Sequence, residues 1–545
     1  MKEFIRKHGI SMVFLLTLVL AVYLPFINNT FVADDDLGIV LNKDLGNIRV
    51  VWQHPLFATK PLLDFFIFKL GGIQPFFFRF SSIFFHVGTT VLIYILILLL
   101  SSELLALVAA SLFAVHPVLT EAVTWISAGG YPLYSFFLLL SLVVYIVWFR
   151  RQKRAAFVLS VVCFLLSASI SEKALVLVPL VGLYHFAFTP PKQWRRKKIL
   201  MSFLPFFGIA LAYGSIVIAG IQGRANAFTT DFYQKVTAYN PFFQIPVAIT
   251  YYLQLVVWPA ILTLYHSEVI GVPEYIVRVV MTLVFFTILA IAYKKNRLLF
   301  FGLGFFLIAI SVTLNPLGLS SLFAERYMYL GSIGLFFAAA IVLEKIGRWL
   351  KNGLIKAVAF GVILLLLSLR TYVRNNDWKT HESFWLAEVK NSPYSFQTHY
   401  NVGTIYMRQA KYKEAILELE KTATLAPNYA DVYQDLAANY HSLHQLRQAL
   451  TMYLQAVKLN PKLWKSLQNI GGIYYQAGKV ELAKDYTLKA IAVNPKAPEL
   501  YINLGVIYLR LNEKKSAQDA FQRAVLLAPD NQIAQQGLKR AKEEH

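Results

Sequence analysis

The pattern of apolar and polar positions changes near residue 372. Before this point, long apolar runs follow one another with short polar interruptions. After it, apolar residues recur every three to four positions among charged ones, which is typical of amphipathic helices. The sequence therefore predicts an all-α chain, with a polytopic membrane helix bundle over 1–371 and a helical array after it.

The second part carries a repeat with a period of 34 residues. Small and aromatic residues keep this period, as do five prolines: Gly403, Ala437, Gly471 and Gly505; Ala415, Ala449, Ala483 and Ala517; Tyr406, Tyr440, Tyr474 and Tyr508; Pro393, Pro427, Pro461, Pro495 and Pro529. This is the tetratricopeptide (TPR) pattern of paired helices. It predicts a junction and N-terminal half-repeat over 372–395, four TPR repeats over 396–530, and a capping helix over 531–545. Such a solenoid presents a groove for a protein or peptide, although a rigid spacer without a ligand has the same pattern.

The first part contains eleven apolar runs that we interpret as membrane spans, several of them shorter than the roughly 17–25 residues that a spanning helix needs. The predicted spans are Gly9–Ile27, Phe76–Leu100, Leu104–Leu119, Tyr131–Phe149, Ala155–Ile170, Ala174–Ala187, Leu200–Ile221, Tyr275–Tyr293, Leu298–Thr313, Tyr327–Leu343 and Leu354–Leu369. The apolar stretch Asn240–His266 is predicted not to cross, but to lie as a helix on the outer face, ending at Trp258 and Pro259.

Lysine and arginine clusters set the predicted orientation, because cytoplasmic loops are enriched in these residues. The clusters are Lys2/Arg6/Lys7, Arg150/Arg151/Lys153/Arg154, Lys192/Arg195/Arg196/Lys197/Lys198, Lys294/Lys295/Arg297 and Lys345/Arg348/Lys351. Eleven spans place all five on one side. The N-terminus is then cytoplasmic, the first span is a retained anchor, and the TPR array lies in a periplasm or an organelle lumen.

The composition agrees with a membrane protein and excludes other classes. Hydrophobic residues make up 57% of the 545 residues and charged residues 15%, against roughly 25% in soluble proteins. The net charge of +22 lies in short clusters between apolar runs, so no nucleic-acid partner is predicted. A single cysteine, Cys163 in an apolar run, excludes a disulfide framework and a cysteine metal cluster.

Ionisable residues collect on the loops predicted to face outward. They are Asp34, Asp35, Asp36, Asp44, Lys60, Asp64, His116, Glu121, Glu172, Lys173, Arg224, Glu325 and Arg326. Each has a local explanation as a helix cap, a helix terminator or a neighbouring ion pair. Together they gather at the ends of apolar spans, where charged groups are costly unless they are paired or functional. The pattern therefore predicts a site at the outer membrane surface.

The carboxylates after the first span suggest the chemistry. One carboxylate can take the proton of an acceptor hydroxyl that attacks a sugar carbon. The pair is also suited to hold a divalent cation, Mg²⁺ or Mn²⁺, opposite a diphosphate leaving group, with Asp35 as the ligand. Arginine, lysine or histidine would stabilise the departing phosphate. No Walker motif is present, so a donor delivered within the membrane fits better than a soluble nucleotide sugar.

Several segments resemble one family, the transmembrane-and-TPR O-mannosyltransferases of the GT-C superfamily. They are FVADDDLGIVLNKDL (31–45), LFAVHPVLTEAV (112–123), YLQLVVWPAILTL (252–264), AERYMYLGSIG (324–334) and RNNDW (374–378), the last directly before the repeats. The resemblance implies a GT-C fold and a glycosyltransferase that uses a polyprenyl-phosphate-linked sugar and a protein acceptor.

The resemblance also implies roles for individual residues. Asp34 and Asp35 match the family's carboxylate pair, and His86, His116, Thr120 and Glu121 match polar positions of the family. Other positions differ: Lys60 stands where the family has arginine, Leu119 where it has a second histidine, and residues 128–131 where it has Gly-Arg-x-Asp. The family's Lys-Glu pair is reversed here, as Glu172 and Lys173. These differences concern the sugar and the acceptor more than the reaction class.

The sequence thus predicts a bacterial relative of this family. Asp34 is the expected base, with Asp35 as its partner or a metal ligand. The residues expected to bind substrate are Lys60, His86, His116, Glu121, Glu172, Lys173, Glu325 and Arg326. The alternatives are a non-catalytic TPR scaffold for an envelope complex, and a ligase or polymerase for lipid-linked glycans.

Overall fold

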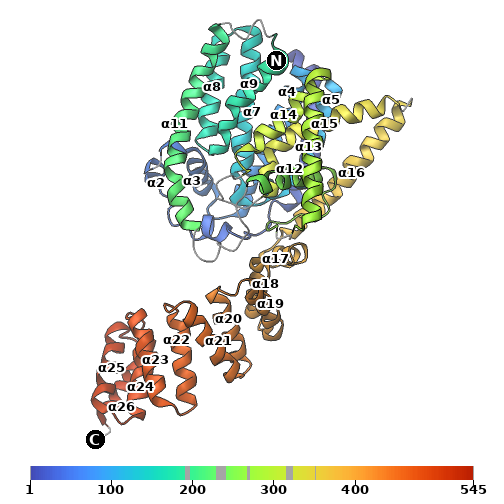
Figure 1. The fold of residues 1–545 in the computed structure, drawn as a ribbon. Coiled ribbons are helices and arrows are strands. Elements are labelled where there is room, and N and C mark those ends of the chain that lie inside the picture. Colours follow the sequence, from blue (N-terminus) through green and yellow to red (C-terminus); the bar gives the residue numbers. More distant parts are fainter. Residues whose placement is uncertain are drawn as a thin grey trace. The chain divides into compact units, whose positions relative to one another are not determined.

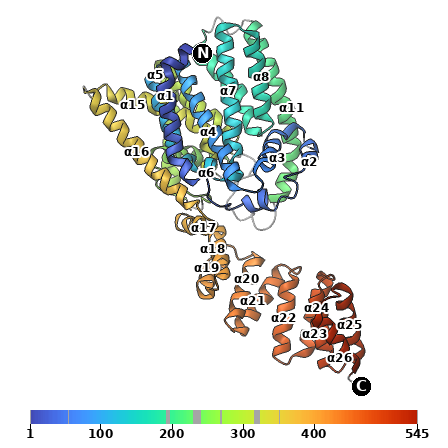
Figure 2. The same cartoon turned by 180° about the vertical axis from the view of Figure 1, so that it is seen from behind.

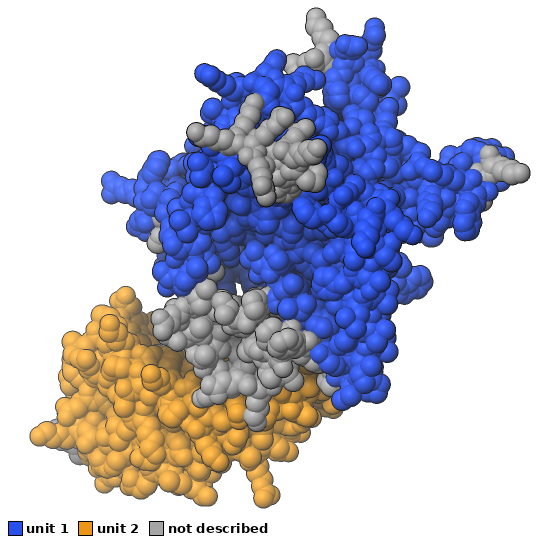
Figure 3. Space-filling model, turned by 45° about the horizontal axis from the view of Figure 1, so that its top comes forward, with its two compact units in different colours: residues 1–392 blue, residues 393–545 orange. Residues whose placement is uncertain are grey.

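The computed structural model describes residues 2–53, 55–190, 197–228, 241–266, 270–314, 323–349 and 352–543. Within these residues the regular elements are helices and no strand occurs (Figure 1). The chain divides into two compact units, Met1–Ser392 and Pro393–His545 (Figure 3). The prediction of an all-α fold is confirmed. Four residues of the predicted basic clusters lie outside the described residues: Lys192, Arg195, Arg196 and Lys351.

Unit 1 is a bundle of long apolar helices joined by short ones. The long helices are α1 (Lys2–Tyr23), α4 (Pro75–Leu100), α5 (Glu103–Val115), α7 (Gly130–Arg151), α8 (Arg154–Ala168), α9 (Leu177–Phe188), α11 (Lys197–Phe228), α12 (Pro241–Val257), α13 (Val272–Lys295), α14 (Arg297–Ser311), α15 (Met328–Gly347) and α16 (Gly353–Asp377). The short elements are η1 (Leu24–Phe26), η2 (Asp36–Val40), α2 (Ile48–Gln53), η3 (Pro55–Phe57), α3 (Thr59–Gly71), η4 (Pro117–Leu119), α6 (Thr120–Thr124), η5 (Ile126–Ala128), η6 (Glu172–Val176), η7 (Glu325–Tyr327) and α17 (His381–Asn391).

Several of these helices fit a multi-pass membrane protein. Among the described residues, seven helices are long and apolar enough to cross a bilayer, and the bent pair Glu103–Val115 and Pro117–Thr124 makes an eighth if it counts as one span. The helices α8, α9 and α14 lie at predicted spans but have only 12–15 residues, below the roughly 17 that span a bilayer alone. The count of eleven spans therefore stays a prediction.

Small residues allow α14 and α15 to pack closely. A Cβ atom at Gly334 would lie 2.2 Å from the Gly302 carbonyl oxygen, and one at Gly302 would lie 2.9 Å from the Gly334 oxygen. Glycines at both positions let the two backbones approach, as is common where membrane helices cross. The turn before α15, η7, contacts α6 and η4.

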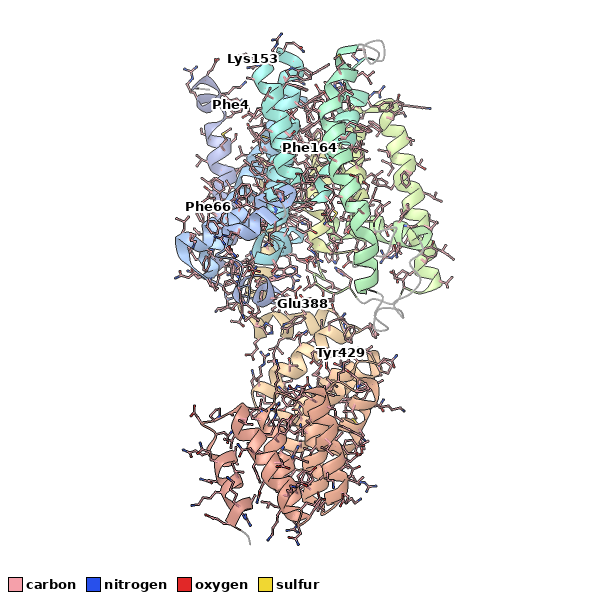
Figure 4. The ribbon with its side chains drawn as sticks, turned by 90° about the vertical axis from the view of Figure 1, so that its left-hand side faces the viewer. Phe4, Phe66, Lys153, Phe164, Glu388 and Tyr429 are labelled. Atoms are coloured by element: carbon pink, nitrogen blue, oxygen red, sulfur yellow. The ribbon has the colours of Figure 1, made fainter. Side chains whose placement is uncertain are left out.

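The two ends of unit 1 differ. Phe4 and Lys153 lie at the end that carries the N-terminus, whereas Phe66 and Glu388 lie toward the opposite end (Figure 4). The short elements α2, α3 and α6 are also at this opposite end (Figure 2). We call it the site end and define it by residues 28–72, 116–130, 258–266, 323–327 and 374–392.

Unit 2 consists of helix pairs at the predicted period. Its helices are α18 (Phe396–Arg408), α19 (Tyr412–Leu425), α20 (Ala430–Ser442), α21 (Leu446–Leu459), α22 (Trp464–Gln476), α23 (Val480–Val493), α24 (Pro498–Arg510), α25 (Lys514–Leu527) and α26 (Gln532–Glu543). The turn within each pair has one residue with positive φ, again every 34 residues: Ala410, His444, Gly478 and Asn512. The small residues that keep the period lie where the two helices of a pair approach closely. At Gly403, for example, a Cβ atom would lie 2.8 Å from the Leu419 side chain.

Candidate functional site

The first loop separates the two adjacent carboxylates. Ala33 has a positive φ of 51°, and the chain turns there before the single π-helical turn η2. Asp34 is exposed, whereas Asp35 is fully buried. The Asp35 carboxylate accepts hydrogen bonds from the Val32 amide at 3.1 Å and from the amide and hydroxyl of Ser127 at 2.8 and 2.6 Å. Asp35 therefore anchors the loop, and Asp34 is the carboxylate that reaches solvent.

The surroundings of Asp35 do not fit a metal ligand. Burial raises the pKa of its carboxyl group, and the hydrogen bonds from Ser127 and Val32 and the charge of Arg79 oppose that rise only in part. Both of its oxygens already accept hydrogen bonds. Within the described residues, no group of three His, Cys, Asp or Glu side chains is placed to hold a metal ion. We therefore derive no step through a divalent cation at Asp35.

A buried arginine fixes the start of this loop. Arg79 on α4 donates from Nε to the Thr124 carbonyl at 3.0 Å and from Nη2 to the Thr30 carbonyl at 2.6 Å, and its Nη1 donates to the Asn29 carbonyl. An arginine buried in this way has a structural role, because its fork-shaped group satisfies three backbone oxygens. Arg79 lies in an apolar run and is not among the residues that the sequence predicts for the site.

The RNNDW segment closes the same end from the other side. Asn375 donates to the Val22 carbonyl at 2.8 Å and accepts from the Thr124 hydroxyl. Its own carbonyl accepts from the Asn29 amide group at 3.2 Å. The segment therefore connects the ends of α1, α6 and α16. This role was not predictable from the position of the segment directly before the repeats.

Glu121 and Arg326 form an ion pair across the site end. Arg326 donates to Glu121 from its backbone amide at 2.9 Å and also from Nη1. The guanidinium lies over the rings of Trp125 and Tyr327, with its carbon 5.5 and 5.0 Å from the ring centres. Glu121 is fully buried, and the Arg326 side chain keeps 18% of its surface exposed. The structure thus joins two residues that are 205 positions apart in the sequence.

Glu172 and Lys173 lie next to this pair. Their side chains form an ion pair at 3.6 Å and are about three-quarters buried. The Lys173 ammonium lies 5.6 Å from the centre of the Tyr131 ring, and that ring is 6.3 Å from the ring of Tyr327. Two cationic groups, Lys173 and Arg326, therefore face one pair of neighbouring tyrosine rings, which are tilted by 36° to each other. Tyr131 stands where the resembling family has aspartate, so an aromatic ring takes the place of a charge.

Lys60 is bound within its own helix. Its ammonium contacts both oxygens of Asp64 at 2.6 and 2.5 Å. Both residues line a small pocket together with Ser82, Ile126 and Gly129. The Thr59 hydroxyl bonds to that of Ser169, which lies just before Glu172. The structure therefore places Lys60 beside the 126–129 turn and near Glu172, with its charge already paired.

The two candidate histidines are inside the bundle. His86 is fully buried, and its Nδ1 lies 2.8 Å from the Tyr329 hydroxyl. His116 is 1% exposed; its Nε2 donates to the Val256 carbonyl at 3.0 Å and its Nδ1 accepts from the Val118 amide at 3.3 Å. His116 thus caps the turn η4 at the break between α5 and α6, and both rings are removed from the surface.

Glu325 belongs to a separate buried network. Its Oε1 accepts from the Thr263 amide. Thr263 also donates from its hydroxyl to Glu388 of α17 at 2.7 Å, and Glu388 pairs with Arg374 at 2.9 Å. The neighbouring His266 has its pKa lowered to about 3 by burial and by the nearby Arg374 and Arg326, so it is neutral at pH 7. Thr263 and Glu388 were not identified from the sequence.

One short segment connects these groups. Ser127 binds Asp35, while the ring of Trp125, two residues earlier, lies under Arg326. Asp34 precedes Asp35 directly, so the exposed carboxylate and the partly exposed arginine are held by the same segment, 125–127. The arrangement offers an exposed carboxylate, Asp34, that is suited to act as a base. It also offers two cationic groups next to aromatic rings, Arg326 at Trp125 and Lys173 at Tyr131.

Comparisons with known proteins agree with this architecture. The tetratricopeptide repeat profile matches residues 396–429, 430–463, 465–496 and 498–531. A protein O-mannosyl-transferase of Caenorhabditis elegans is 25% identical over 475 residues, 78% of this chain and 64% of the relative. Protein O-mannosyl-transferase TMTC3 of Mus musculus is 24% identical over 497 residues, 79% of this chain and 53% of the relative. The chain thus spans between about half and two thirds of the length of these relatives.

Among solved structures, the chain is similar to the TPR protein YrrB, with 21% identity and a TM-score of 0.27 over 36% of this chain and 97% of that chain.

The relatives named above come from animals, so the expectation of a bacterial relative is not borne out. The similarity to the animal enzymes covers both the helical bundle and the repeats. The homologues of this chain are therefore protein O-mannosyltransferases of the transmembrane-and-TPR family.

Proposed function

We propose that the chain is an integral membrane glycosyltransferase that moves a sugar, mannose by analogy with its relatives, from a polyprenyl-phosphate-linked donor to a protein hydroxyl. The observation that carries this proposal is segment 125–127, which holds the exposed Asp34 through Asp35 and the cationic Arg326 through Trp125. A hydroxyl from the aqueous side and a lipid phosphate from the membrane could meet there.

The chemistry needs a base and a cationic site. Asp34 takes the proton of the acceptor hydroxyl, whose oxygen forms a bond to the anomeric carbon while the bond from that carbon to the phosphate oxygen breaks. The leaving polyprenyl phosphate gains negative charge, which Arg326 and Lys173 stabilise. Glu121 accepts hydrogen bonds from the Arg326 amide and from one guanidinium nitrogen, and in this proposal it orients Arg326 toward the phosphate. Asp35 orients the loop.

The TPR repeats supply acceptor selection in this proposal. TPR solenoids bind proteins and peptides, and the relatives' names describe transfer to protein. We place the N-terminus in the cytoplasm, and the site end and the repeats on the exported side, in a periplasm or lumen. In support, Phe4 and Lys153, which belong to or lie near basic clusters, are at the end of unit 1 opposite Glu388 (Figure 4).

A set of single substitutions tests the proposal. With polyprenyl phosphate mannose as donor and peptides rich in serine and threonine as acceptors, Asp34→Asn should lower turnover by about 10² to 10⁴, the usual contribution of a base. Its donor binding and melting temperature should match wild type. Asp44→Asn, at another exposed carboxylate of the same loop, is the matched control and should retain turnover.

Asp35→Asn should lower stability, because the asparagine NH₂ group would replace an oxygen that accepts a hydrogen bond from Ser127 or Val32, and two donors would then face each other. We expect a loss of about 1–3 kcal/mol in stability, seen as a lower melting temperature, and no rescue by added Mg²⁺ or Mn²⁺.

An Asp34→Asn protein with more than a tenth of wild-type turnover would remove Asp34 from the mechanism and favour the scaffold alternative.

A further inference from the structure

Five ionisable side chains lie close together at the site end, and among the described residues one of them forms no ion pair. Glu121 pairs with Arg326, and Glu388 pairs with Arg374 at 2.9 Å. Glu325 is fully buried and forms no ion pair with the described residues, although the charge of Arg374 acts on it. Its Oε1 accepts from Thr263, and its Oε2 has no hydrogen-bond partner among the described residues. An incompletely satisfied buried carboxyl group is costly, so its presence calls for an explanation.

The contacts of Glu325 form a continuous path from α17. Glu388 accepts from the Thr263 hydroxyl and the Leu264 amide, both at 2.7 Å. The Thr263 amide in turn donates to Glu325, and Glu325 precedes Arg326 in the tight turn η7. The two residues share this turn, and the Arg326 amide donates to Glu121 at 2.9 Å, so the contacts of Glu325 and Arg326 bear on the same short stretch of backbone. We call Glu388, Thr263, Glu325 and Arg326 the α17 relay.

The other end of the relay is covalently joined to the repeats. Ser392, the last residue of unit 1, donates to the Tyr265 carbonyl at 2.5 Å and also contacts the Thr263 hydroxyl. Asn391 donates to the Leu262 carbonyl at 3.0 Å. The first residue of unit 2, Pro393, follows directly. Segment 262–265 is thus bound by the part of the chain that leads into the TPR array.

We propose that Thr263 and Glu325 are positioning residues that transmit the placement of α17 to Arg326, so that engagement of a partner by the repeats adjusts the contact of Arg326 with its ligand. The identity of that ligand, a donor phosphate, rests on the proposed function; the relay itself does not. Coupling of this kind needs an element with two arrangements, and we propose that the second arrangement gives the Glu325 Oε2 atom, which has no partner among the described residues, a hydrogen bond.

The test uses the full-length chain in lipid nanodiscs and a variant that keeps the shape of the side chain. Thr263→Val removes the hydroxyl that binds Glu388 and keeps the volume. Hydrogen–deuterium exchange of the backbone amides of 324–327 should become at least several-fold faster, although Glu325 binds the Thr263 amide and not the substituted hydroxyl. Thr371→Val is the matched control: this fully buried hydroxyl donates to the Val115 carbonyl, outside the relay, and exchange at 324–327 should not change.

A second measurement follows the ligand. With polyprenyl phosphate mannose, Thr263→Val should raise KM about fivefold or more, in the range of typical coupling between sites, and change kcat less. Thr263→Ser, which restores the hydroxyl, should return both exchange and KM toward wild type. A structural role confined to α17 predicts faster exchange only at 262–266 and 381–392; that result, with an unchanged KM, would overturn the relay.

The two proposals fail separately. If wild-type protein binds no donor, the proposed function is wrong, and exchange at 324–327 still decides the relay. If Thr263→Val cannot be recovered folded, Glu388→Gln is measured in the same way; unchanged exchange at 324–327 in that variant would also overturn the proposal.

Discussion

At the scale of single residues, burial decides what a side chain can do in this chain. Asp34 and Asp35 are adjacent, but the positive φ at Ala33 directs one carboxylate to solvent and the other into the hydrogen bonds of Ser127. A carboxylate with three protein donors cannot also take a proton from a substrate without losing them. The same reasoning applies to Lys60, which would have to exchange Asp64 for a phosphate.

A buried carboxyl group in the repeats makes stability depend on pH. Burial raises the pKa of Asp435 to about 6, and the hydrogen bond from the Tyr400 hydroxyl at 2.8 Å only partly opposes this. The unfolded pKa is about 3.9, so the folded repeats bind more protons between pH 4 and 6. The contribution of Asp435 to stability is therefore fully present below about pH 4 and is lost as the pH rises through 6.

We expect Asp435→Asn to remove this dependence. Between pH 4.5 and 7, the wild-type TPR unit should lose about 1–2 kcal/mol more stability than the variant. A shift of about two pKa units corresponds to about 3 kcal/mol, and the lower value allows for the part of the side chain that solvent reaches. Urea unfolding of residues 393–545 at the two pH values measures it. Asp519→Asn, at an exposed carboxylate, should behave as wild type. Parallel curves for wild type and Asp435→Asn would contradict the assignment.

The residues of the site were only partly predictable from the sequence. Charged residues at the ends of apolar runs are visible as exceptions, which is how Glu121 and Arg326 were found. Their pairing was not visible, because 205 positions separate them and no local spacing rule connects them. Thr263 and Glu388 were missed since each looks ordinary in its own segment, whereas Arg79 is an exception in an apolar run whose backbone partners only the fold reveals. Only the fold brings Thr263 and Glu388, 125 positions apart, within 2.7 Å.

At the scale of elements, α17 shows where periodicity stops being informative. The sequence predicts an N-terminal half-repeat over this region, and a helix is present there. The helix and the residue after it, however, belong to unit 1 and bind its 262–265 segment: Asn391 to Leu262, Ser392 to Tyr265 and Thr263 to Glu388. The ring of Phe384 also packs 4.5 Å from that of Trp378 at the end of α16. An amphipathic pattern states that a helix has one apolar face, but not which neighbour covers it.

The position of α17 predicts how two truncations differ. A chain ending at Ser392 keeps Glu388 beside Arg374 and should melt close to full-length protein, bind polyprenyl phosphate mannose and hydrolyse it, while transfer to a protein acceptor falls. A chain ending at Trp378 leaves Arg374 buried without Glu388, which typically costs about 3–5 kcal/mol. We therefore expect a clearly lower melting temperature for the shorter chain. Equal melting temperatures would show that α17 is not part of unit 1.

At the scale of the whole molecule, the fold class and the repeats were predictable because each rests on a long regular pattern. The 34-residue period of the sequence is also seen in the backbone, because the turns have a residue with positive φ at Ala410, His444, Gly478 and Asn512. The number of spans is less determined, since α8, α9 and α14 are apolar but short, and α5 and α6 bend by 55° at His116 and Pro117. Hydropathy alone does not distinguish a short span from a helix that is buried among others.

The orientation of the chain can be measured directly. The basic clusters predict that Lys153 is cytoplasmic, while Lys69 on α3 and Lys515 on α25 are on the exported side. All three residues are exposed. Single cysteines at these positions, in a Cys163→Ala background, are treated with a membrane-impermeant maleimide in intact cells or in sealed vesicles of defined sidedness. Positions 69 and 515 should react from the exported side, and position 153 only after the membrane is permeabilised.

Lys69 and Lys515 make the result specific. Lys69 reports the side on which the first loop and Asp34 lie, and Lys515 reports the side of the repeats. An odd number of spans places them together on the side opposite Lys153, because each crossing exchanges the two sides of the membrane. Reaction at 515 but not at 69 would separate the repeats from the proposed base, and a protein acceptor held by the repeats could then not reach Asp34. Reaction at 153 in intact cells would reverse the whole arrangement.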